Sequence, residues 1–197
     1  MSVLINLIEL KKKLLINGNR GLTSNEDLLL FETIDKGIAS EIKAEDVANY
    51  FIARAKQEKI NLHNMHLQNL VYLSQCINLA AYNDTIFQED VMAWDFGPVI
   101  PTIYNKLRTY GNGFVSDYIG EYAGKEIFTP KANLVLNKVW DLFVIDCLSK
   151  YKNANLYISN LVKGVGSPWH KIFIESEKHY DIIEPREMAK YYAKWIK

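Results

Sequence analysis

The sequence predicts a mainly α-helical protein with a small antiparallel β element at about residues 86–128. Apolar residues recur at spacings of three and four over most of the chain, which is the period of an amphipathic helix. Glycine, proline and asparagine separate these stretches at the places where helices start and stop. Closely spaced β-branched and aromatic residues occur mainly between Thr85 and Phe128, which limits strands to the middle of the chain.

Two helices are expected in an N-terminal extension, residues 1–43. The first covers Val3–Ile16 and fades at Asn17-Gly18-Asn19, and the second covers Ser24–Ile42 with Ser24 as its N-cap. The run Leu28, Leu29, Leu30 and Phe31 is more apolar than one buried helix face needs. We therefore treat these four residues as a candidate surface for partner specificity; the alternative is that the extension completes the protein's own core.

Two further helices precede the β element. One starts near Ala44, and Val47, Tyr50, Phe51 and Ala55 form its apolar stripe. The next follows Asn61 and ends before Asn83-Asp84; its helical positions are Leu67, Leu70, Val71, Ser74, Ile77 and Ala81.

In the middle of the chain, the helical spacing of apolar residues gives way to short β-prone stretches. We expect a short strand within Thr85–Phe96, a break at Gly97-Pro98, and a helix from Pro101 to Gly111. We also expect two short strands within Asn112–Thr129, on either side of Gly120 and Gly124.

The last third is helical again. A long helix over Thr129–Tyr151 carries a wide apolar stripe, which suggests the central core helix; the stripe is Leu136, Val139, Trp140, Phe143, Val144, Cys147 and Leu148. Short helices are expected around Leu156–Val162, after the cap Ser167-Pro168, and from Pro185 to the end.

Charge and composition narrow the function. The 23 basic and 23 acidic residues cancel, and residues 1–60 alone are balanced at nine of each. This even distribution disfavours binding to nucleic acid or to an anionic membrane surface. We find no signal peptide and no apolar run near the roughly 20 residues that span a bilayer, so we expect a cytoplasmic protein.

Candidate catalytic and metal-binding residues are isolated. His63 and His66 lack further ligands at zinc spacing, so we interpret them as partly exposed surface residues. His170 and His179 have no metal-ligand neighbours at suitable spacing. Apolar surroundings favour inert core thiols for Cys76 and Cys147. We expect no metal and no cofactor.

Four carboxylates, Asp84, Glu89, Asp90 and Asp95, offer acid–base chemistry or simply charge a loop. The second interpretation is favoured, because nothing else in the sequence completes a catalytic constellation. Phosphate-binding glycine loops and the Gly-x-Ser-x-Gly nucleophile motif are absent from the sequence.

Four stretches carry a resemblance to a known family. They are Val47–Ile52; Leu67-Gln68 with Leu70–Gln75; Ala93-Trp94-Asp95-Phe96-Gly97-Pro98-Val99-Ile100-Pro101 with Tyr104, Leu107 and Tyr110-Gly111; and Ser167-Pro168-Trp169. In order and spacing they resemble the Panacea domain, the SocA-like antitoxin domain of phage-associated proteins, over about residues 44–197. The motif residues, structural or partner-binding, are Gln68, Tyr72, Gln75, Trp94, Phe96, Gly97, Pro98, Tyr104, Tyr110, Pro168 and Trp169.

The resemblance implies a bacterial or phage-encoded antitoxin, not an enzyme, that binds and neutralises a toxin encoded by an adjacent gene. Abundant Tyr and Trp are compatible with a protein interface, although they also serve as core residues. Alternatives are a regulatory adaptor from a phage or mobile element, a hydrolase using Asp95 or His170, and a DNA-binding regulator. A homodimer is also open.

Overall fold

The computed structural model describes residues 42–122, 124, 127–194 and 196. Both predicted N-terminal helices, apart from Ile42, lie outside these residues, and so do Leu28, Leu29, Leu30 and Phe31. The elements are, in order, α3 (Ala44–Glu58), α4 (Asn64–Tyr82), β1 (Met92–Trp94), β2 (Gly97–Val99), α5 (Pro101–Leu107), η1 (Arg108–Tyr110), α6 (Pro130–Trp140), η3 (Asp141–Ile145), α7 (Asp146–Lys150), α8 (Ala154–Val162), α9 (Pro168–His170), η4 (Lys171–Glu175) and α10 (Pro185–Ala193).

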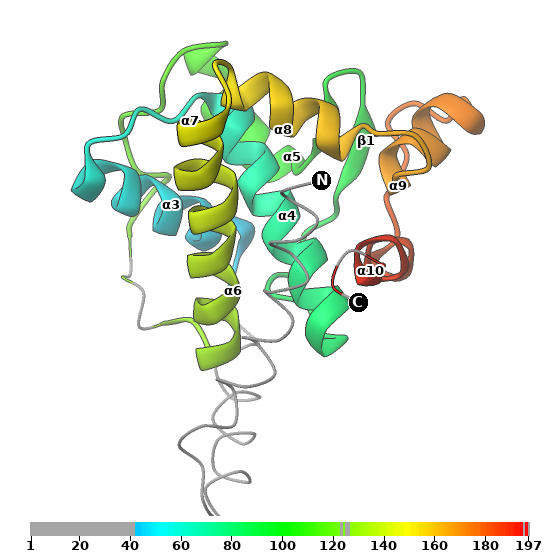
Figure 1. Cartoon of the computed structure of the whole chain (residues 1–197), viewed down its shortest axis with the longest axis horizontal. Helices are drawn as coiled ribbons and strands as arrows, with labels where there is room; N and C mark the ends of the chain where they lie inside the picture. The colour runs from blue at the N-terminus through cyan, green and yellow to red at the C-terminus, as the bar shows by residue number, and fades with distance from the viewer. Residues whose placement is uncertain (1–41, 123, 125–126, 195, 197) are drawn as a thin grey trace, which may run out of the picture.

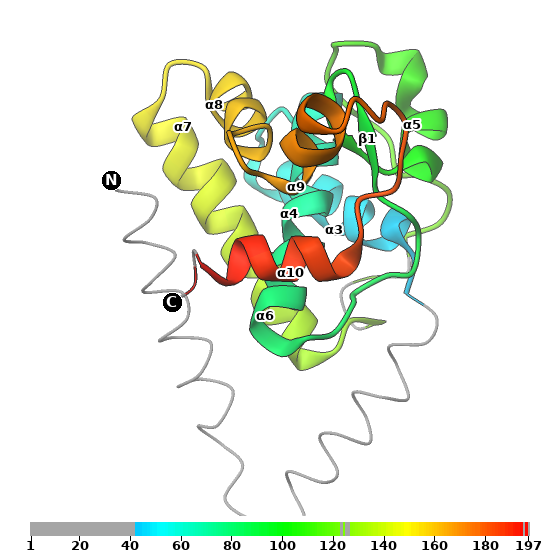
Figure 2. The same ribbon diagram turned by 90° about the vertical axis from the view of Figure 1, so that its right-hand side faces the viewer.

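Helix α4 is the centre of this arrangement. Helices α3, α6, α8 and α10 and strand β2 all pack against it, and Figure 1 shows α4 between α3 and α6 on one side and α10 on the other. Figure 2 shows α10 lying across α4. The expectation that the 129–151 helix is the central one is therefore wrong: that segment forms one wall, and α4 is buried on nearly every side.

The helix predicted over Thr129–Tyr151 is confirmed, but the winding of its middle departs from that of an α-helix. Trp140, Phe143, Val144 and Cys147 are buried as predicted, beside the buried face of α4. Residues Asp141–Ile145 form a π-helical segment, whose i→i+5 bonding shifts the phase of the buried stripe. As a consequence Leu148, expected in the stripe, is exposed.

The antiparallel β element consists of β1 and β2, with Met92 opposite Val99 and Trp94 opposite Gly97. The free edge of β1 is covered by the chain leading into α10, because Ala93 bonds through its N–H to Asp181 O (2.9 Å) and through its C=O to Tyr180 N (2.8 Å).

The predicted hairpin within 112–129 is wrong for the described residues. Phe114 makes only an isolated bridge to His63. Ile119 is held instead by the side chain of Asn49, which accepts from its N–H at 2.7 Å.

Helix boundaries agree with the capping signals. Thr129 and Ser167 accept from the N–H groups of Ala132 and His170, each at 3.1 Å, and a proline follows each cap. Asn83, after α4, adopts the left-handed conformation of a helix stop. Among the described residues no helix is both long enough and apolar enough to cross a bilayer.

Candidate functional site

Motif residues from distant parts of the chain meet around residues 94–99, the motif turn. The Trp94 ring lies edge-on between Tyr104, at 4.8 Å between centroids, and Tyr180, at 5.5 Å. From α9, the indole Nε1 of Trp169 donates to Trp94 O at 2.7 Å. The turn is thus fixed from three sides, by α5, by α9 and by the segment before α10.

The tip of the turn depends on a glycine. Gly97 has φ +126°, a conformation that side-chain-bearing residues rarely adopt. Of the two aromatic motif residues at this turn, Trp94 braces it through its ring contacts and Phe96 does not. Phe96 is 62% exposed, because the tight turn directs it away from the core.

Two glutamines of α4 hold the segment that carries the turn. Gln75 donates to Phe87 O and accepts from Ile86 N, both at 2.8 Å. Two helical turns earlier, Gln68 accepts from Ile100 N at 3.2 Å. The two amides therefore anchor the chain before β1 and after β2. The available signal was their spacing of seven residues, which places both on one face of the helix.

A groove lies beside the motif turn. We name it the motif groove; its main lining residues are Met65, Gln68, Phe96, Val99, Tyr104 and Arg108, and its volume is about 210 Å³. It brings together Gln68, Phe96 and Tyr104, three of the predicted motif residues. Its lining also includes Asn64, Gly111 and Asn112.

The remaining motif residues lie elsewhere. Tyr72 is buried and packs edge-on against Tyr192, and burial raises its pKa well above the ordinary value. Pro168 is buried as the first residue of α9. Tyr110 donates its hydroxyl to Asp117 at 2.8 Å. Their contacts are those of structural residues.

The histidines do not form a metal site. His66 is buried, not partly exposed as predicted, since α4 has almost no solvent face; its Nε2 donates to Phe143 O at 3.1 Å in the π-helical segment. Burial lowers the pKa of His66 to about 4, so the ring is neutral at pH 7. His63 bonds to Asn112 O through Nδ1. No set of three or more metal-ligating side chains gathers within the described residues.

The cysteines are inert, as predicted. Both are free and buried. Burial raises the pKa of the Cys147 thiol to about 11 and that of Cys76 well above its ordinary value. A thiol that stays protonated at neutral pH is a poor nucleophile.

Three of the four candidate acidic residues have structural partners, and the fourth, Asp90, is exposed. Glu89 accepts from Ala44 N at 3.0 Å, at the start of α3, and Asp95 accepts from the Tyr180 hydroxyl at 2.9 Å. Asp84 accepts from Thr85 N and, through its carbonyl, from Asn78.

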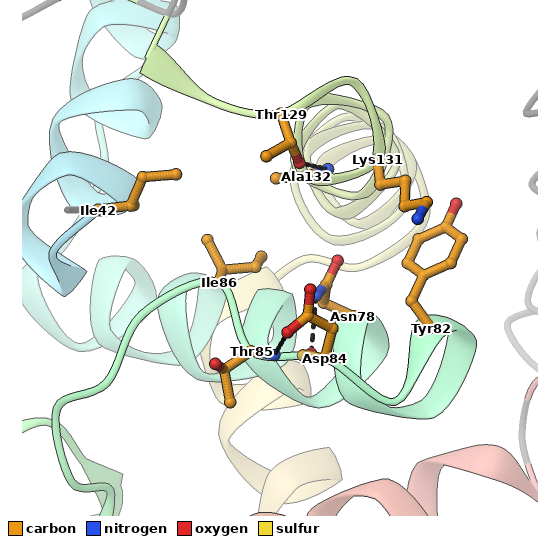
Figure 3. A pocket seen from close by; sticks show the side chains of 9 residues that line it. All are labelled: Ile42, Asn78, Tyr82, Asp84, Thr85, Ile86, Thr129, Lys131 and Ala132. Atoms are coloured by element: carbon orange, nitrogen blue, oxygen red, sulfur yellow. Dashed lines mark hydrogen bonds between the residues drawn. The ribbon is translucent and has the colours of Figure 1, made fainter. Parts of the chain in front are cut away.

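Asn78, Asp84 and Thr85 line a small cavity (Figure 3), where Lys131 points toward the Tyr82 ring. Its volume of about 10 Å³ is room for one water molecule at most.

A comparison with known protein families finds a match over part of the chain. The family model described as antitoxin SocA-like, Panacea domain, matches residues 67–157. No curated protein and no solved structure gives a significant match. The matched range begins in α4, includes the motif turn and α5, and ends in α8. Residues 67–157 are therefore similar to the Panacea domain of the SocA-like antitoxins.

Proposed function

We propose that this protein is an antitoxin that neutralises a toxin by stoichiometric, non-covalent binding, without turnover. One observation carries the proposal: inside the segment matched to an antitoxin family, an aromatic side chain is held out into solvent on a firmly braced turn. Phe96 is exposed, whereas Gly97, Pro98 and Val99 beside it are buried. An exposed aromatic on a rigid support is a typical anchor of a protein interface, because little entropy is lost on binding.

The surroundings of the candidate catalytic groups support binding over catalysis. Asp95 and His170 were the residues considered for a hydrolase. Asp95 accepts from Tyr180, and His170 Nδ1 lies 3.0 Å from Glu175 within the same short helical segment. Hydrogen bonds that fix a turn and a helix end account for both residues.

The limits of the domain are part of the proposal. Helices α3 and α10 lie outside the matched range but pack on α4, so we assign residues 44–197 to one Panacea-like domain. We propose residues 1–43, with Leu28, Leu29, Leu30 and Phe31, as the element that selects the partner toxin. The protein would act in the cytoplasm of a bacterium, on a toxin from an adjacent gene.

Co-expression tests this proposal. The chain is expressed with the product of each adjacent gene, and growth and co-purification are scored. We expect one neighbour to arrest growth alone, to be harmless in the presence of the chain, and to elute with it at a fixed molar ratio. Rescue at a substoichiometric ratio, or no rescue by any neighbour, contradicts the proposal.

Deletion of residues 1–43 tests the specificity element. If the truncated protein folds but no longer binds the toxin, the assignment holds. If it binds at full strength, the assignment is wrong. If it does not fold, the extension belongs to the core instead.

A further inference from the structure

We infer that the motif groove receives an apolar side chain flanked by a carboxylate, presented by an acidic segment of the partner. The inference rests on the proposed function in one respect, namely that the segment belongs to the toxin. It adds the chemistry by which the segment is recognised.

The walls and size of the groove suit a side chain. Met65, Phe96, Val99 and Tyr104 supply apolar surface from α4, the motif turn and α5. The volume of about 210 Å³ is below the roughly 300–1,000 Å³ of pockets for drug-sized ligands. One or two side chains of a protein fill such a space. Met65 is half-buried, and its flexible thioether adapts to different apolar partners.

The charge at the groove is of one sign. Arg108 is exposed and is the only charged residue that lines it. Within the described part of the chain its guanidinium makes no ion pair, whereas nearby Lys106 is paired with Glu45 at 2.6 Å. A guanidinium offers a planar fork of donors that matches a carboxylate. The favoured occupant therefore carries Asp or Glu beside its apolar residue.

Two buried amide atoms in the lining residues lack partners. Gln68 Nε2 and Asn64 Oδ1 are buried and make no hydrogen bond within the described residues. Exchanging the nitrogen and oxygen positions of either amide would not remove the unpaired atom, because existing hydrogen bonds fix both orientations. Gln68 uses its oxygen to accept from Ile100 N, and Asn64 uses its nitrogen to donate to Leu107 O and Gly111 O.

An unpaired buried polar atom destabilises the free protein, so its presence needs an explanation. A donor and an acceptor side by side on one helix face match the C=O and N–H of a peptide backbone. Since both atoms are closed to solvent, the wall must open when the segment enters, and the flexible side chain of Met65 is the part of the wall best able to move.

A peptide array tests this inference without the toxin. Immobilised seven-residue peptides vary a central Leu, Ile, Met, Phe or Trp between two Asp, and a matched set carries Asn in place of Asp. The labelled full chain is applied. We expect the Asp peptides to bind about two- to fivefold more tightly than their Asn counterparts, the range for an exposed ion pair. The variant Arg108→Gln is expected to bind both sets equally.

Two further variants locate the binding. Met65→Trp fills the groove and is expected to abolish binding, while Leu156→Trp, at the exposed first turn of α8, leaves it unchanged; thermal unfolding confirms that each variant folds. Absence of binding to every peptide, equal binding of the two sets by the unmodified chain, or full binding by Met65→Trp overturns the inference. A toxin that co-purifies although the array is negative refutes this inference alone. Preferential binding of the Asp peptides without any co-purifying toxin refutes the antitoxin role but supports the proposed chemistry of the motif groove.

Discussion

Gln75 on α4 and Phe96 on the motif turn belong to the same motif set, yet their surroundings differ. Gln75 is buried, and both the nitrogen and the oxygen of its side-chain amide form hydrogen bonds with the chain before β1. Phe96, on the segment held in this way, faces solvent. Motif residues in a buried helix thus support a neighbouring turn, while the residue at the tip of that turn is free to contact a partner. Substitution of the two residues should therefore have different effects: a change at Gln75 should lower stability, and a change at Phe96 should weaken binding.

The α4 side of this comparison gives the largest expected effect. Gln75→Leu leaves Phe87 O and Ile86 N without partners in the core, so we expect the free energy of unfolding to fall by about 2–4 kcal/mol. Urea denaturation measures it. The matched control is Gln88→Leu, which replaces an exposed glutamine next to Phe87 in the segment that Gln75 holds. It should change stability by less than about 0.5 kcal/mol. Equal effects of the two substitutions would show that Gln75 does not anchor the segment.

A second prediction concerns pH and the buried ring on α4. The pKa of His66 is about 4 in the folded protein, below its ordinary 6.5. Between these values the unfolded chain takes up a proton that the folded protein does not, so stability is lost as the pH falls from 6.5 toward 4. We expect a loss of about 2 kcal/mol between pH 7 and pH 5.

Urea unfolding at both pH values checks this, with His66→Gln as the comparison. The variant should lose this part of the pH dependence, whereas the control His63→Gln should retain it. A His66→Gln protein with the pH dependence of the unmodified chain would rule out His66 as its source.

A smaller effect is expected at the motif turn itself. Gly97→Val places a branched residue at φ +126°, so we expect a loss of about 1–2 kcal/mol from backbone strain. A side chain at this position would meet only Lys163, with its nearest atom at 3.6 Å, so crowding adds little.

The melting temperature measures this strain. Leu156→Val is the control, because it introduces the same branched side chain at an exposed position of α8 where φ is not positive. An unchanged melting temperature for Gly97→Val would mean that the turn is not held in this conformation.

The helices could be predicted from the sequence, because apolar periodicity and capping residues are local signals. Thr129 and Ser167 marked helix starts correctly. The strands could not be placed well, since β1 and β2 have three residues each, too few for an alternating pattern. The β-prone residues near Phe114 also led to a wrong prediction, that of a hairpin, because β propensity does not decide which segments pair with one another.

Tertiary burial explains the other errors. The sequence of α4 contains many polar residues, and a polar face normally indicates solvent; here His66, Gln68, Asn69 and Gln75 are buried with the apolar ones. The exposure of Leu148 follows from a π-helical segment that no periodicity reveals. The motif groove likewise depends on α4, the motif turn and α5 coming together, and only the motif resemblance pointed to that place.

The most direct test of the motif turn as the binding surface replaces Phe96. Phe96→Ser and the control Leu156→Ser remove side chains of similar exposure, 62% and 56%, from the motif turn and from α8. Each variant is measured by urea denaturation and by its affinity for the co-purifying toxin. We expect both to keep their stability within about 0.5 kcal/mol, and only Phe96→Ser to weaken binding, by about tenfold or more, as for an interface anchor. Unchanged affinity for Phe96→Ser, or an equal loss for Leu156→Ser, would contradict the assignment of the motif turn as the binding surface.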